Sequence, residues 1–186
     1  MRIRSALLLC WVGVLGLPLA GQSDTRYVAP GGSHSPPFTN WVTAATNIQA
    51  AIDVSTTGDI VLVTNGTYQT GGRTAPGSLT TNRVVIDKAI TVKSVNGPVV
   101  TVIRGAFQPG GTNGNAAIRC AWMTNNAVLA VFTLTNGATR ASDYGGGVWC
   151  QSTAAYISNC FIVGNAADAE GGGVLFGSLQ FCTLAG

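Results

Sequence analysis

Acidic residues recur at equivalent places ahead of two glycine triplets. Asp143 precedes the first triplet, and Asp168 and Glu170 precede the second. Clustered carboxylates can act as acid and base on a glycosidic bond, or can hold Ca²⁺ through oxygen ligands. When the triplets are aligned, Tyr144 matches Glu170, which predicts that these side chains lie near one edge of the fold. The alternative is that they are ordinary solvated loop residues.

An arginine and a tryptophan form the second candidate group. Arg119 and Trp149 each stand between apolar residues in short strand-like segments, which predicts that both point outward. An exposed tryptophan can stack on a sugar ring, and an arginine can pair with a carboxylate. The alternative is that a loop covers them, since tryptophans are usually well buried. The ligand-binding candidates are therefore Arg119, Trp149, Asp143, Tyr144, Asp168 and Glu170, and no residue is predicted to be catalytic.

Several kinds of chemistry find no support in the sequence. His34 is the only histidine, which argues against a histidine-dependent triad and a histidine-ligated zinc site. The glycine triplets are followed by neither Lys-Ser/Thr nor a helix pattern, so they are not phosphate loops. No cofactor is expected; Ca²⁺ fits the chemistry of the carboxylates but has no motif. Enzymatic activity stays open.

The first 20 residues have the pattern of a secretory signal peptide. Arg2 and Arg4 give a basic start, and residues 6–19 are almost unbrokenly apolar. That run is shorter than the roughly 20 residues that span a bilayer. Without Arg2 and Arg4, eight of the ten basic residues remain against seven acidic ones. We therefore expect a secreted or cell-surface protein with no membrane span and no nucleic-acid partner.

A repeat is the main evidence for the fold. A Gly-Gly-Gly-Val run at 145–148 returns at 171–174, and Ile118-Arg119-Cys120 is aligned with the segment 148–150. A second pattern recurs with its apolar spacing intact. Its members are Leu129, Phe132 and Leu134, then Ile157, Cys160 and Ile162, then Leu179, Cys182 and Leu184. These segments alternate at period two and are broken by glycine and asparagine, which indicates short strands rather than helices.

Short strands that repeat in this way can bury their inner faces only by stacking on their neighbours. The prediction is an all-β fold, a right-handed, single-stranded parallel β-helix. The predicted inward columns are Ile118, Val148 and Val174; Cys120, Cys150 and Phe176; Phe132, Cys160 and Cys182; and Leu134, Ile162 and Leu184. In-register stacking points neighbouring Cβ atoms the same way, which is poor disulfide geometry. The cysteines are therefore interpreted as small buried hydrophobes.

The region before the repeats is predicted to open the stack. Ile48, Ala51 and Ile52 follow Asn47 at helical spacing, which predicts a short capping helix with an asparagine N-cap. Strands are expected at 60–63, 84–86, 89–92 and 99–103, and a loop at 108–115. The predicted organisation is a signal peptide over 1–20, an N-terminal cap and first turns over 21–115, and regular turns over 116–186. Because no closing cap follows the last turn, a C-terminal truncation is expected.

Three segments, 27–32 (YVAPGG), 47–68 and 86–106, resemble the start of pectin lyase-like right-handed β-helix proteins, and 157–174 resembles their repeats. The last segment is more loosely similar to repeats of polymorphic outer-membrane proteins, which are surface adhesins. The resemblance covers nearly all the chain after the leader. It implies a fold rather than an activity, because pectate lyases, pectinesterases, polygalacturonases and uncharacterised surface proteins share it. No lyase or esterase catalytic motif matches residue by residue.

Two functional hypotheses follow from this resemblance and from the candidate residues. The first is a protein directed at extracellular polysaccharide or a cell-surface glycan, by binding it or, in the complete protein, by lyase- or hydrolase-type cleavage. The second is a surface adhesin or structural stalk without catalysis.

Overall fold

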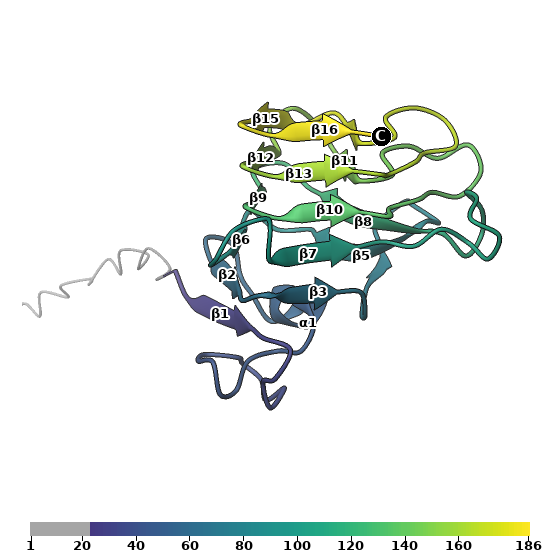
Figure 1. Cartoon of the computed structure of the whole chain (residues 1–186). Coiled ribbons are helices and arrows are strands. Elements are labelled where there is room, and N and C mark those ends of the chain that lie inside the picture. The colour runs from purple at the N-terminus through teal and green to yellow at the C-terminus, as the bar shows by residue number, and fades with distance from the viewer. Residues whose placement is uncertain (1–22) are drawn as a thin grey trace, which may run out of the picture.

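Short β-strands make up nearly all of the regular structure in the computed structural model, which describes residues 23–186 (Figure 1). The predicted signal peptide therefore lies outside the described residues. The strands form three sheets. The first sheet contains β1 (Thr25–Val28), β2 (Ile60–Val63), β6 (Thr91–Ser94), β9 (Val128–Ala130), β12 (Tyr156–Ser158) and β15 (Ser178–Gln180). The second contains β3 (Gly66–Tyr68), β7 (Thr101–Arg104), β10 (Thr133–Thr135), β13 (Phe161–Val163) and β16 (Thr183–Ala185). The third contains β4 (Arg73–Thr74), β5 (Thr81–Ile86), β8 (Ile118–Met123), β11 (Val148–Cys150) and β14 (Val174–Leu175).

The chain visits the three sheets in a fixed order. From β6 onward it passes through the first, second and third sheets and then begins again, so that each layer lies on the one before (Figure 1). Among residues 23–186, every pair of strands is parallel except β4 with β5. The all-β prediction is confirmed, and so is the parallel pairing of the repeats.

The repeat spacing predicted from the sequence is confirmed in the first and second sheets, although Leu184 in the last strand is 51% exposed and Cys182 is only partly buried. Ile157 pairs with Leu129 on one side and Leu179 on the other. Leu134, Ile162 and Leu184 are likewise in register. The side chains of Phe132 and Cys160 are buried in the central core. Equal spacing between apolar residues is sufficient here because these strands are all of similar, short length.

The predicted register of the third sheet is partly wrong. Val148 does pair with Val174, but its other partner is Ala121 rather than Ile118, and Cys150 pairs with Met123 rather than Cys120. The strand β8 is six residues long and β11 only three. The apolar-x-apolar pattern of β11 can therefore be aligned with either half of β8, 118–120 or 121–123. In the observed register Trp122 pairs with Trp149.

Phe176 departs from its predicted inward column as well. Its residue follows β14 with a φ of 56°, and its side chain is 58% exposed. The backbone turns there instead of continuing as a strand, so the side chain leaves the core.

The predicted capping helix is α1 (Ile48–Asp53), and its cap is confirmed. The Asn47 side chain accepts a hydrogen bond from the Ala50 backbone N–H at 2.9 Å. Gln49 from the helix also covers the edge of β5: its side-chain amide accepts from Val85 N at 2.6 Å and donates to Val85 O at 3.3 Å. A side chain thus takes the place of a neighbouring strand, which blocks further pairing at that point.

The four cysteines of residues 23–186 are unpaired, as predicted, and three of them are fully buried. Burial raises the pKa of the Cys120, Cys150 and Cys160 thiols to about 12. Within the same residues, no helix has the length and hydropathy needed to cross a membrane.

Candidate functional site

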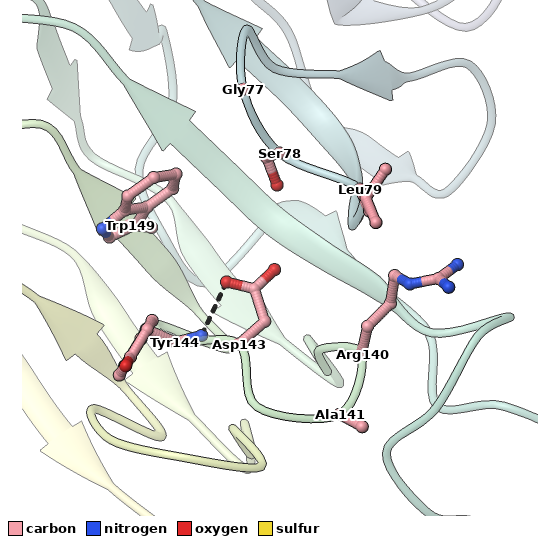
Figure 2. Close-up of a pocket in the computed structure, with 8 residues that line it drawn as sticks. All are labelled: Gly77, Ser78, Leu79, Arg140, Ala141, Asp143, Tyr144 and Trp149. Carbon is pink, nitrogen blue, oxygen red and sulfur yellow. Dashed lines mark hydrogen bonds between the residues drawn. The ribbon is translucent and has the colours of Figure 1, made fainter.

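A pocket lies on the outer face of the third sheet, between two loops and a strand (Figure 2). We call it the aromatic pocket; its volume is about 320 Å³ and its lining residues are Gly77, Ser78, Leu79, Arg140, Ala141, Asp143, Tyr144 and Trp149. One wall is the loop between β4 and β5, and the other is the loop between β10 and β11. Trp149 on β11 contributes the base.

Trp149 points outward because its neighbours in β11 point inward. Val148 and Cys150 are both fully buried, and side chains alternate along a strand. Trp149 pairs with Trp122 in the adjacent strand, and the two rings meet edge to face with centroids 6.1 Å apart. Trp122 is itself buried in a small cluster with Ala75 and Val85, outside the central core. The partly exposed ring of Trp149 therefore rests on a rigid apolar support.

Arg119 lies beneath the pocket and is 0% exposed. Its guanidinium donates to Gly145 O at 2.8 Å and to Tyr144 O at 2.6 Å, and its carbon Cζ lies 5.4 Å from the centre of the Trp149 ring. Burial lowers the pKa of Arg119, and the charge of Asp143 opposes that effect. The structure therefore favours the alternative in which a loop covers Arg119, rather than an arginine free to meet a ligand.

Asp143 is a half-buried anchor of the pocket wall. Its carboxylate accepts from Tyr144 N at 2.8 Å and from the Thr80 hydroxyl, and it lies 3.0 Å from the Arg119 guanidinium. Burial by itself would raise the pKa of Asp143, but the bonds from Thr80 and Tyr144 and the charge of Arg119 hold it below its usual value. A general acid needs a raised pKa, so this carboxylate is suited to anchoring rather than to proton donation.

Asp168 and Glu170 do not line the aromatic pocket. The Asp168 carboxylate accepts from Ser142 N at 2.7 Å, and the backbone oxygen of Glu170 accepts from Gly145 N at 3.0 Å. Their loop therefore supports the loop that carries Asp143. Among residues 23–186, no group of three or more His, Cys, Asp or Glu residues is arranged to hold a metal ion.

Five of the eight lining residues were not predicted from the sequence: Gly77, Ser78, Leu79, Arg140 and Ala141. Leu79 from the first wall and Arg140 from the second lie toward one end of the pocket, and Trp149 and Tyr144 lie toward the other, with Asp143 between them (Figure 2). Leu79 is 76% exposed. In the part of the chain that the structure describes, the Arg140 guanidinium has no carboxylate partner. Arg140 lies only three residues before Asp143, and that proximity was the available signal; nothing local singles out Leu79.

Comparisons with protein-family profiles, with curated proteins and with solved structures found no match for this chain. The resemblance to pectin lyase-like proteins therefore stays a prediction, and the argument for function depends on the geometry of the pocket.

Proposed function

We propose that this chain is a secreted or surface-displayed right-handed parallel β-helix protein that binds extracellular polysaccharide in the aromatic pocket. The fold part of the proposal is supported by the order in which the chain visits its three sheets and by their parallel pairing. Stacked layers of this kind place successive loops next to one another along one side of the stack. The resulting extended surface suits a long polymer ligand.

The observation that carries the binding proposal is the exposed aromatic surface inside the pocket. Trp149 is partly exposed, and Tyr144 beside it is 40% exposed. Flat aromatic rings bury the apolar face of a sugar ring while leaving its hydroxyls free to bond elsewhere. The pocket volume of about 320 Å³ is at the small end of the range for ligand sites, which fits one ring of a longer chain.

Arg140 supports a preference for acidic over neutral polysaccharide. The charges of Arg119 and Asp143 balance one another at 3.0 Å, whereas the Arg140 guanidinium is left to meet an incoming group. A planar guanidinium binds carboxylate and sulfate groups through two parallel hydrogen bonds. The pocket as a whole therefore presents one net positive charge next to a stacking surface.

Binding of polygalacturonate, alginate and neutral galactan to the full chain, measured by titration calorimetry, tests the proposal. Trp149→Ala should weaken binding of the preferred polymer by about tenfold or more, since the aromatic ring on which a sugar would stack is lost. Trp41→Ala is the matched control, because Trp41 is also partly exposed but packs against Tyr27 away from the pocket. Arg140→Gln should weaken only the acidic polymers and flatten their salt dependence.

Two results would overturn this proposal. One is that none of the three polymers binds to the wild-type chain. The other is that Trp149→Ala binds as tightly as Trp41→Ala.

An adhesin or stalk without catalysis is the second candidate. It is supported by the same stacked layers, together with exposed apolar side chains such as Phe161 on the second sheet. An adhesin of this kind would bind a protein surface and leave all three polysaccharides unbound.

A further inference from the structure

One buried hydroxyl joins the two walls of the aromatic pocket. Thr80 ends the first wall and is 0% exposed. Its hydroxyl donates to the Asp143 carboxylate and accepts from the Arg140 backbone N–H at 3.2 Å, so it contacts the second wall twice. These partners lie 63 and 60 residues away in the sequence.

The connection continues from Thr80 to the base of the pocket. Asp143 lies 3.0 Å from the Arg119 guanidinium, which is held by Asn82 Oδ1 at 2.7 Å and lies against the Trp149 ring. We call Thr80, Asp143 and Arg119 the buried brace. It links both walls and the base. Thr80 and Arg119 are fully buried and the Asp143 side chain is 21% exposed, and hydrogen bonds of charged groups are stronger where little water reaches them.

We infer that Thr80 is a positioning residue for ligand binding, because its hydroxyl fixes the separation of the walls and so the placement of Arg140 relative to Trp149. This inference rests on the proposed function. Thr80 itself does not line the pocket, so it acts through Asp143 and Arg140 rather than by touching a ligand.

The physical benefit of the buried brace is preorganisation. Leu79 and Arg140 are carried by loops, and loops that must be ordered on binding reduce affinity. With the walls already joined, the ligand meets groups that are in place. Losing the hydroxyl should therefore speed dissociation more than it slows association.

The test compares Thr80→Val, which removes the hydroxyl with little change in shape, with Thr80→Ser, which keeps it. Thr80→Val should weaken binding of polygalacturonate by about tenfold, mostly through faster dissociation, and Thr80→Ser should stay within about twofold of wild type. Thr124→Val is the matched control, because its hydroxyl bonds Gln151 at 2.8 Å at an exposed place after β8. Each variant should keep a wild-type thermal midpoint to within a few degrees; Thr80→Ala replaces Thr80→Val if that variant does not fold.

Hydrogen exchange in the free protein gives a readout that needs no ligand. Thr80→Val should raise the exchange rates of the Arg140 and Tyr144 amides by about tenfold, and Thr80→Ser should not, since both amides depend on the buried brace. Unchanged exchange in Thr80→Val would overturn the inference, and so would a Thr80→Ser variant as impaired as Thr80→Val. Absence of polysaccharide binding to the wild type, with exchange altered as expected, would overturn the proposed function alone.

Discussion

Val131 carries a backbone conformation that its branched side chain opposes. It follows β9 with a φ of 69°, and the equivalent residues of the next two layers, Asn159 and Phe181, have φ of 51° and 53°. Asparagine adopts this left-handed conformation with little strain, whereas a β-branched residue is a clear outlier there.

Val131→Asn should therefore stabilise the protein by about 1 kcal/mol, since it removes strain at a half-buried position that needs little packing. The free energy of unfolding in urea measures this. Val128→Asn is the matched control: it puts the same substitution in the extended part of β9 and should destabilise. A less stable Val131→Asn would show that its methyl groups contribute more than the strain costs.

Gln49 connects the helix α1 to the edge of β5. Gln49→Met keeps the length of the side chain but leaves Val85 N and O without their partners. A buried backbone group without a hydrogen bond costs about 1–3 kcal/mol, so this variant should unfold at lower urea concentration. Gln69→Met, at an exposed position after β3, is the control and should change stability little. Equal stability of the two variants would contradict a capping role for Gln49.

The elements also show which parts of the fold and site the sequence could predict. The alternation and equal spacing of apolar residues were sufficient to predict the register of the strands that contain Leu129 and Leu134, because each of those short strands can be aligned in only one way. The same pattern failed to predict the register of β8, because its six residues allow two alignments with β11. The burial of Arg119 depends on Asn82 and on the loop oxygens of Tyr144 and Gly145. Contacts between residues so far apart in the chain leave no local pattern in the sequence. Leu79 was missed for the same reason, because nothing in the neighbouring sequence marks it as a pocket residue.

Two carboxylates, the buried Asp59 and the half-buried Asp143, couple the stability of the whole fold to pH. Burial tends to raise the pKa of Asp59, but hydrogen bonds from the Thr56 and Asp24 backbone and the charge of Arg26 hold it below its usual value. The pKa of Asp143 is also below its usual value. The folded protein therefore binds fewer protons than the unfolded chain at acid pH. The stability that these groups contribute is present above about pH 4 and is lost as pH falls through their folded pKa values.

Unfolding free energies measured from pH 7 to pH 2.5 should stay level at first and fall steeply in the acid range. The double variant Asp59→Asn, Asp143→Asn should be less stable at pH 7 and show a shallower fall, because the groups that titrate are gone. An equally steep fall in the double variant would assign the acid sensitivity to other carboxylates.

The two walls of the aromatic pocket precede β5 and β11, strands that are separated in the third sheet by β8 alone. Gene duplication of the intervening layer would preserve backbone pairing throughout yet move the walls apart by about 4.8 Å, one strand spacing. Thr80 would then no longer reach Asp143. Layers could thus be added after β11 without moving the two walls, while an insertion between β5 and β11 would separate them in a single step.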